Sequence, residues 1–433
     1  MPLTAATLTG AARLKSVPFE EGPIVSSHHG AGTPSGIDGL RRALAAPPRR
    51  TAGAHRQRVA AIVTAGGLLF AACSGSVTSV APTAAPSSVA AIAPIDSTAA
   101  GGGGATSPAA SAAPAATPTP SPVPLVVYSA QGYDSAMTKA FQAATGIPVQ
   151  LVDDSTGPLL VKVQAEKSNP RWDVLWVDGD EAFASLDQQG YLVKGYEPSV
   201  TFNALGSSLI PTDKSYVPTG VTMAGTVVYS SKNVTAPPTT WNDLLSPTWK
   251  GQVGMNDPAV SGPTYPFVAG LFNYLGGVSQ GEAFLRQLKV NGLKVNQTNG
   301  DTLHALEGGQ IKIGLIQSSA GIGAEAKDPS LKTGFISPST PIPSVIGIDA
   351  KTSPQAIAEA EQFAAFVLSA QGQSVMESGD PSGDSLYWPV VDGVQPLSQL
   401  PALSSVPARP IDPVLWGSRE NAINTWFTDN IVQ

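Results

Sequence analysis

Short apolar runs alternate with amphipathic stretches in this chain from residue 125 onward. Residues 125–129, 149–152 and 173–177 are short, largely apolar runs, which predict strands. Between them, residues 134–144 and 155–167 carry capping residues and the apolar spacing of amphipathic helices. Strands and helices that alternate with short connections predict a parallel sheet covered by helices on both faces.

The same alternation continues to the end of the chain. β-branched and aromatic residues between 216 and 233 predict extended strands, interrupted at Gly220 and Gly225. The pattern then predicts strands at 253–255, 293–295, 311–316 and 345–348, and helices at 240–245, 265–288, 301–307, 354–370 and 419–427.

The segment before the predicted domain has the pattern of an export signal. Residues 59–72 are uncharged and mostly apolar, and four arginines between 49 and 58 precede them. The run is shorter than the roughly 20 residues that span a bilayer, so it fits the apolar region of a signal peptide. Leu69-Phe70-Ala71-Ala72-Cys73 resembles a bacterial lipobox. We therefore expect a lipoprotein signal over 49–73 and lipidation of Cys73, with a plain cleaved signal or a short anchor as the alternative.

Two further segments fall outside the predicted fold. Residues 1–48 lack sustained periodicity, and we expect either a start codon placed too early or a dispensable leader. In residues 74–122, 43 of 49 residues are Ala, Ser, Thr, Pro or Gly, and Asp96 carries the only charge. Such a segment buries too little apolar surface to offset its ordering entropy, which predicts a disordered linker.

Charge and cysteine usage narrow the function classes. From residue 74 onward there are 17 basic and 29 acidic residues, a net charge of −12, which argues against nucleic-acid binding. With Cys73 used as an anchor, the predicted domain has no thiol for a disulfide or a cysteine metal site. The 311 residues of 123–433 are enough for two packed lobes.

Several motifs occur together in a characteristic order. They are LVVYSAQG with TGIPVQLV, then DVLWVDGDEAFASLDQQGYL, then VVYSSKNVTAPPTTWNDLLSPTWKGQVGMNDPAVSG, then FAAFVLSAQGQSVM. This set resembles the extracellular solute-binding proteins of ABC importers, in the subgroup for ferric iron, phosphonates and sugar phosphates. The resemblance implies a two-lobed α/β fold of the type II periplasmic-binding class, each lobe a mostly parallel sheet with helices on both faces. Residues 123–222 would begin lobe 1, 223–342 would form lobe 2, and 343–433 would return to lobe 1 and end in helices, with a hinge between the lobes.

The candidate ligand-binding residues follow from this fold. In open α/β sheets ligands bind beyond the carboxyl ends of the strands, where helix N-termini favour oxyanions. The residues at those turns are Ser129, Gln131, Ser155, Thr156, Gly157, Asp178, Ser261, Thr264, Ser318 and Ser319. Each hydroxyl is also explained as an ordinary helix cap, and Asp178 as the cap of the helix that follows it. Trp176 is a candidate for stacking on an organic ligand, with core packing as the alternative.

Iron coordination is a separate hypothesis. The ferric binders of this class use a tyrosine pair with a histidine or an acid, whereas this chain has Gln317-Ser318-Ser319 after the strand at 311–316. His304 is the sole histidine of residues 123–433, inside a predicted helix. We therefore expect no protein metal site and no cofactor. A ferric-iron or iron-chelate binder of the same transporter class is the alternative.

The resulting functional hypothesis is high-affinity capture of a small polar or anionic solute outside the cell. The resemblance implies delivery to an ABC import permease, with the protein a monomer held at the membrane by lipidated Cys73. A ligand-sensing surface lipoprotein without transport is the alternative from another class. No G-x-S-x-G elbow occurs and a Ser/His site would depend on His304 alone, so we expect no enzyme.

Overall fold

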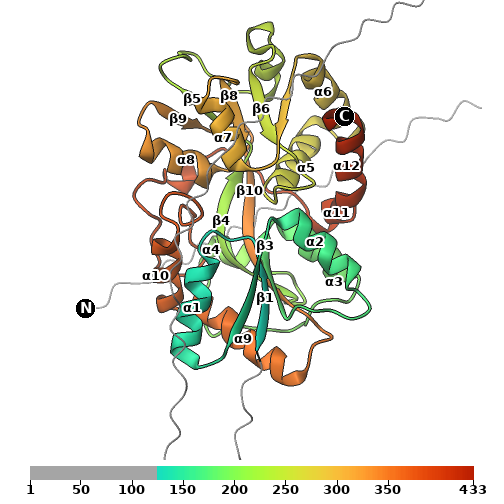
Figure 1. Ribbon diagram of the computed structural model, residues 1–433, viewed down its shortest axis with the longest axis vertical. Coiled ribbons are helices and arrows are strands. Elements are labelled where there is room, and N and C mark those ends of the chain that lie inside the picture. The colour runs from blue at the N-terminus through green and yellow to red at the C-terminus, as the bar shows by residue number, and fades with distance from the viewer. Residues whose placement is uncertain (1–123) are drawn as a thin grey trace, which may run out of the picture. The chain divides into compact units, whose positions relative to one another are not determined.

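The strands form two five-stranded sheets of the same layout (Figure 1). The computed structural model describes residues 124–433. The first sheet has the order β2-β1-β3-β10-β4 and the second has the order β7-β6-β8-β5-β9. In each sheet the first two neighbouring pairs are parallel and the last two are antiparallel. Both sheets are therefore mixed, whereas the sequence predicted mostly parallel sheets.

The elements alternate along the described chain. The strands are β1 (Leu125–Ser129), β2 (Val149–Asp153), β3 (Val174–Asp178), β4 (Tyr216–Ala224), β5 (Thr226–Ser230), β6 (Val253–Asn256), β7 (Lys294–Asn296), β8 (Ile313–Ile316), β9 (Leu331–Gly334) and β10 (Thr340–Ile348). The longer helices are α1 (Asp134–Thr145), α2 (Thr156–Ala165), α3 (Asp180–Gln188), α4 (Ala204–Leu209), α5 (Thr264–Leu275), α6 (Val278–Val290), α7 (Asn299–Glu307), α8 (Ser318–Lys327), α9 (Pro354–Leu368), α10 (Ala370–Gly379), α11 (Pro413–Gly417) and α12 (Glu420–Phe427). Short helices are η1 (Trp241–Leu245), η2 (Pro247–Trp249), η3 (Leu403–Ser405) and η4 (Thr428–Val432).

The first sheet is buried on both faces because its apolar residues point alternately to either side. In β3, Val174 and Trp176 join a core with residues of α1, α9 and α10. Leu175 and Val177 point the other way and pack with residues of α2 and α3. We call this sheet with these helices the first lobe.

The second sheet is covered in the same way. Val227, Val253 and Leu315 pack against the apolar faces of α5 and α6. Val228 and Ile316 form a smaller core on the other face with residues of α7 and α8. This sheet and these four helices are the second lobe, so the predicted two-lobed α/β fold is confirmed.

Two long strands run from one lobe to the other (Figure 1). β4 and β10 pair antiparallel from Thr340↔Ala224 to Gly347↔Tyr216. Between β4 and β5, Gly225 has φ +67°, and a Cβ there would lie 2.6 Å from Phe267. Only glycine fits this backbone and this contact, so Gly225 marks the passage of the chain into the second lobe.

The C-terminal helices pack on both lobes. Phe427 and Ile431 belong to the core of the second lobe, and the Lys289 amine donates a 2.8 Å hydrogen bond to the Asn430 carbonyl. Gly417 of α11 lies against the backbone of Glu181 in α3, where a Cβ on Gly417 would be 2.1 Å from the Glu181 carbonyl oxygen. The end of the chain therefore connects the second lobe to the first.

Two local predictions differ from the structure. Gly220 lies inside β4 and does not interrupt it, because the strand is buried on both faces and continues through the residue. The helical region 265–288 is divided into α5 and α6 at Gly276 and Gly277, whose φ values of +100° and +127° cannot continue a helix. The short helix predicted at 240–245 is present as η1, and Thr240 forms a capping box with Asp243 at its start.

Several predictions concern parts of the chain outside the described residues. These are the leader over 1–48, the signal over 49–73 with Cys73, and the linker over 74–122. The lobe boundaries remain predictions.

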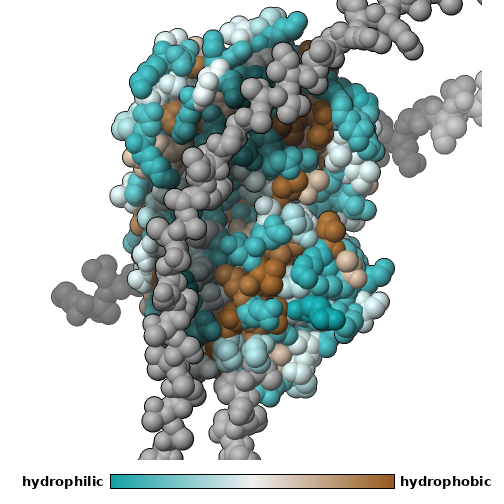
Figure 2. All heavy atoms as spheres, in the orientation of Figure 1, coloured by the Kyte–Doolittle hydropathy of each residue, from teal (hydrophilic) through white to brown (hydrophobic). Residues whose placement is uncertain are grey.

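Within residues 124–433, no helix combines the length and apolarity needed to cross a bilayer. Hydrophilic side chains cover most of the face seen in Figure 2, with apolar ones gathered mainly in its lower half.

Candidate functional site

The polar turns of the first lobe meet in a buried hydrogen-bonded cluster. Ser129 ends β1, and its hydroxyl accepts a 3.2 Å hydrogen bond from the Gln131 amide. The Gln131 side-chain amide donates to Asp178 Oδ1 at 3.1 Å, and the Ser344 hydroxyl of β10 donates to the same oxygen at 2.6 Å. Three strands of the first sheet thus bring these side chains together.

Asp178 does not cap the helix that follows it. The residue before α3 is Gly179, with φ +95° and no side-chain cap. Asp178 instead ends β3 and accepts the hydrogen bonds from Ser344 and Gln131. Burial raises the pKa of its carboxyl, and these two hydrogen bonds oppose that effect.

More carboxylates surround the turn after β1. The Gly132 amide donates a 2.7 Å hydrogen bond to Asp384 Oδ2. Burial, followed by the repulsion of Asp178, raises the pKa of Asp384 to about 7. Burial also raises the pKa of Asp134 to about 6, against the hydrogen bond of Ser129. No basic side chain is among the groups that shift the pKa values of Asp134, Asp178 and Asp384.

The two lobes touch directly beside this cluster. The Gly157 amide, at the start of α2, donates a 3.1 Å hydrogen bond to the Val260 carbonyl of the second lobe. A Cβ on Gly157 would lie 2.0 Å from the Ala259 carbonyl oxygen, and a Cβ on Gly262 would lie 2.1 Å from the Thr156 hydroxyl. Glycine is required at both positions for this approach. The structure is therefore that of closed lobes.

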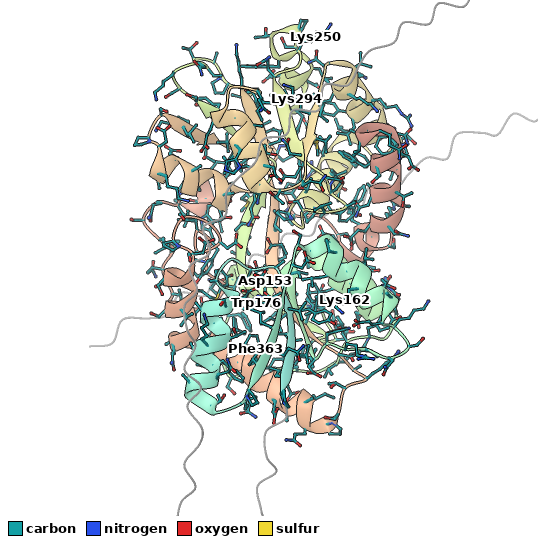
Figure 3. All side chains as sticks on the ribbon, viewed as in Figure 1. Asp153, Lys162, Trp176, Lys250, Lys294 and Phe363 are labelled. Carbon is teal, nitrogen blue, oxygen red and sulfur yellow. The ribbon has the colours of Figure 1, made fainter. Side chains whose placement is uncertain are left out.

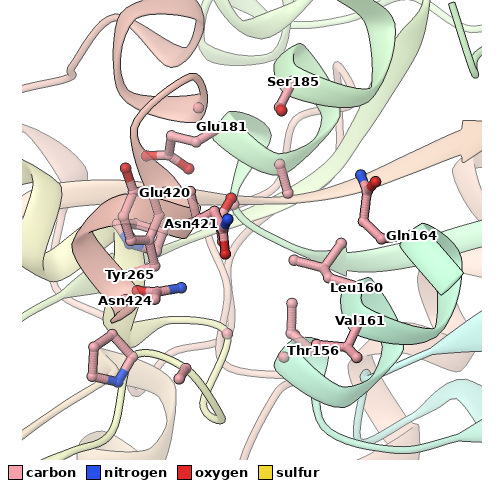
Figure 4. A pocket seen from close by; sticks show the side chains of 18 of the residues that line it. Thr156, Leu160, Val161, Gln164, Glu181, Ser185, Tyr265, Glu420, Asn421 and Asn424 are labelled. Carbon is pink, nitrogen blue, oxygen red and sulfur yellow. The ribbon is translucent and has the colours of Figure 1, made fainter. Parts of the chain in front are cut away.

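A pocket of about 610 Å³ opens next to this contact (Figure 4). The first lobe supplies α2, the Asp178–Gly179 turn and α3, while the second lobe supplies residues 258–266 and the C-terminal segment supplies 417–428. Thr156, Gly157 and Asp178, all predicted as site residues, line it. The volume is in the usual range for small-molecule sites.

One side of the pocket is acidic. Figure 4 shows the carboxylates of Glu181 and Glu420 near each other, with Thr156, Leu160 and Val161 across the pocket. Burial, followed by the charge of Asp180, raises the pKa of Glu181 well above its usual range. Burial raises the pKa of Asp180 and of Glu420 to about 7 each. The described lining residues include no lysine, arginine or histidine.

Other predicted residues lie around the lobe contact, outside the pocket lining. Ser155 precedes α2 without a side-chain cap. The Ser261 hydroxyl accepts a 3.1 Å hydrogen bond from the Asn256 amide, and Thr264 is buried at the start of α5. Their roles in ligand binding remain predictions.

Ser318 and Ser319 lie side by side at the start of α8. The Ser318 hydroxyl accepts a 3.0 Å hydrogen bond from the Met223 amide of β4, which ties α8 to the strand that joins the lobes. The Ser319 hydroxyl is buried and has no hydrogen-bond partner within the described part of the chain. Neither residue lines the pocket, and their predicted ligand contacts remain predictions.

Trp176 packs in the core of the first lobe. It is fully buried, its indole nitrogen donates a 3.1 Å hydrogen bond to the Thr219 hydroxyl, and its ring lies 5.9 Å from that of Phe363 (Figure 3). Stacking on a ligand is therefore not its role in this structure.

Lys250 and Lys294, also labelled in Figure 3, lie at the outer end of the second lobe.

Sequence reasoning missed the pocket residues of α3 and of the C-terminal segment. Glu181 follows the Asp178–Gly179–Asp180 turn, so its place beyond a strand end was a usable signal. Glu420, Asn421 and Asn424 belong to a helix to which the sequence assigned no function. No group of three or more His, Cys, Asp or Glu side chains within residues 124–433 is placed to hold a metal ion.

Comparisons with known proteins agree with this architecture. Residues 136–408 match the family model described as bacterial extracellular solute-binding protein. A protein of Salmonella paratyphi A described as 2-aminoethylphosphonate-binding and periplasmic is 23% identical over 193 residues. That match covers 45% of this chain and 55% of the relative, so the chain spans about half the length of this relative.

Solved structures share the fold at low sequence identity. Iron-bound HitA from Pseudomonas aeruginosa is 21% identical with a TM-score of 0.60, over 70% of this chain and 99% of that one. AfuA from Actinobacillus pleuropneumoniae, with fructose-6-phosphate bound, is 18% identical with a TM-score of 0.63, over 71% and 98%. At these identities the likeness concerns the fold alone.

Proposed function

The chain belongs to the bacterial extracellular solute-binding proteins, and we propose that it captures one small polar solute outside the cytoplasm and delivers it to an ABC import permease. The observation that carries the proposal is the pocket beside Gly157, to which both lobes contribute. A solute seated there would contact both lobes at once and would favour the closed arrangement over an open one.

The relatives indicate a range of solutes. The Salmonella relative is described as binding an aminoalkyl phosphonate, and the two solved structures hold iron and a sugar phosphate. We propose a solute of the size of the organic members of this range. Ferric iron or an iron chelate is the alternative, and it is carried by the likeness to HitA.

A thermal-shift screen of small polar solutes tests the proposal. One solute should raise the melting temperature, and at 100 times its dissociation constant it should add about 2.7 kcal/mol of stability. Ferric citrate and ferric chloride form separate arms of the screen. Stabilisation by iron alone would favour the alternative, and no stabilisation by any solute would contradict the proposed function.

Attachment and delivery are further parts of the proposal. We propose that lipidated Cys73 holds the protein at the outer side of the cytoplasmic membrane and that the protein acts as a monomer. Cys73→Ser should release the protein from the membrane fraction, and retention there would refute the anchor.

Uptake of the identified solute should fall when this gene is deleted. Unchanged uptake would instead favour a sensing lipoprotein without transport.

A further inference from the structure

The pocket is lined by a buried carboxyl group, that of Glu181, with one oxygen that lacks a hydrogen-bond partner among the described residues. Glu181 is 2% exposed, and its Oε2 has no hydrogen-bond partner within the described part of the chain. This oxygen lies only 3.0 Å from the position that a Cβ on Gly179 would occupy, so the glycine leaves room for it. Buried polar groups of folded proteins are ordinarily paired, and an unpaired one calls for an explanation.

The groups that face Glu181 are acidic or neutral. Asp180 precedes it on α3 and Glu420 faces it from α12. The negative charge of either residue disfavours ionisation of Glu181 and raises its pKa. Tyr265 of α5 lies near both glutamates, and its hydroxyl is already used in a 2.5 Å hydrogen bond to the Trp416 carbonyl. The Asn424 side-chain oxygen is a second buried acceptor without a partner in the described region.

The basic residue next to Glu420 in the sequence is directed elsewhere. Arg419 precedes Glu420, but its guanidinium stacks on the Trp416 ring at 5.2 Å and it does not line the pocket. The pocket therefore presents carboxyl and amide oxygens without a basic partner among its lining residues. Its missing component is a positively charged group that donates several hydrogen bonds, which is the chemistry of an ammonium.

We propose that the solute carries a protonated amine, and that this amine sits between the carboxylates of Glu181 and Glu420 with the Asn424 oxygen as a further acceptor. The proposal rests on the proposed function, which it deepens by naming a substrate class: amines and zwitterions that carry an ammonium group. Across the pocket, Thr156 at the start of α2 offers a hydroxyl to a second polar group of the solute.

Matched pairs of solutes test the amine directly. The probes are 2-aminoethylphosphonate against ethylphosphonate, and putrescine against 1,4-butanediol, measured by thermal shift and calorimetry on the purified full chain. We expect binding by at least one amine and at least ten-fold weaker binding by its partner without the amine. Equal binding within a pair, or no binding by any amine, overturns the proposal.

Charge-removing variants locate the subsite. Glu181→Gln and Glu420→Gln should each weaken binding of the amine by about ten- to one-hundred-fold, as for a lost hydrogen bond to a charged group. Glu307→Gln is the matched control, because it removes the same charge from the exposed end of α7. Circular dichroism verifies folding, and the half-buried Glu420 provides a second test if Glu181→Gln misfolds. Unchanged affinity in both pocket variants overturns the proposal.

The outcome separates the two proposals. If anionic or neutral solutes bind and amines do not, the solute-binding function stands and the amine subsite is wrong. If no solute of any class binds, the proposed function itself fails, and the amine subsite fails with it.

Discussion

The backbone amide of Gly157 donates a 3.1 Å hydrogen bond to the carbonyl oxygen of Val260, and this bond joins the two lobes. The contact has no room for a side chain, since a Cβ on Gly157 would lie 2.0 Å from a backbone oxygen. This contact between the lobes therefore depends on the absence of a side chain at Gly157.

Gly157→Ala should hinder closure of the lobes. We expect a larger radius of gyration by small-angle scattering and at least ten-fold weaker solute binding, which corresponds to about 1.4 kcal/mol. Gly300→Ala is the control, because its nearest neighbour lies 3.7 Å from the added Cβ. Identical scattering and affinity in the two variants would contradict closure through Gly157.

Ser318 and Ser319 provide a matched pair of hydroxyl deletions. Ser318→Ala would leave the buried Met223 amide without its acceptor, which should cost about 1–3 kcal/mol of unfolding free energy. Ser319→Ala removes a buried hydroxyl without a partner among the described residues, so it should leave stability unchanged or raise it slightly. Urea denaturation of the unliganded protein measures both. Equal losses would argue against a structural role for Ser318.

The unliganded protein should become less stable as pH rises from about 5 to 8. Asp180, Asp384 and Glu420 have pKa values raised to about 7, so the folded state binds more protons than the unfolded state in this window. Each carboxyl contributes at most about 1.4 kcal/mol per pH unit, and less where solvent screens it. Carboxyls with a lowered pKa, such as Asp243, titrate below this window.

Denaturant titrations at several pH values measure this slope. Glu420→Gln should make the loss of stability less steep, whereas Glu307→Gln should leave it unchanged. A stability that rises over this window would mean that these carboxyls are not buried as the structure has them.

Phe363→Ala should strongly destabilise the first lobe. The ring is fully buried and meets those of Phe141 and Trp176 edge-on at 5.2 and 5.9 Å. Large-to-small changes of this kind cost about 3–5 kcal/mol. Val290→Ala on α6, where the side chain is 83% exposed, should be nearly neutral in the same denaturation experiment. A small loss in Phe363→Ala would show that this core can collapse around the cavity.

The fold could be predicted because its signals are local. Apolar runs set β1 and β3, Gly146 ends α1 in the left-handed conformation, and Thr240 with Asp243 forms a capping box. The antiparallel half of each sheet was not predicted, because the position of β10 between β3 and β4 depends on long-range pairing that no local pattern records.

The site could be predicted only in part, for a similar reason. Thr156, Gly157 and Asp178 follow strands directly, and the strand-end rule brought them to the pocket. The proximity of Glu181 to Glu420 depends on how the last helices pack on α3, and the two residues are far apart in the sequence. The predicted turns suggested a site for oxyanions, whereas the packed side chains add an acidic side that composition alone could not locate.

The strand order has a consequence for folding during synthesis of the chain. β10 lies between β3 and β4, so the first sheet stays incomplete until residue 348 has left the ribosome. Contacts so distant in sequence form slowly, because the entropy of closing the long loop is lost before the contact forms. A nascent chain of this design cannot complete its first sheet while most of it is synthesised, and an incompletely folded chain is the form that the proposed export would require.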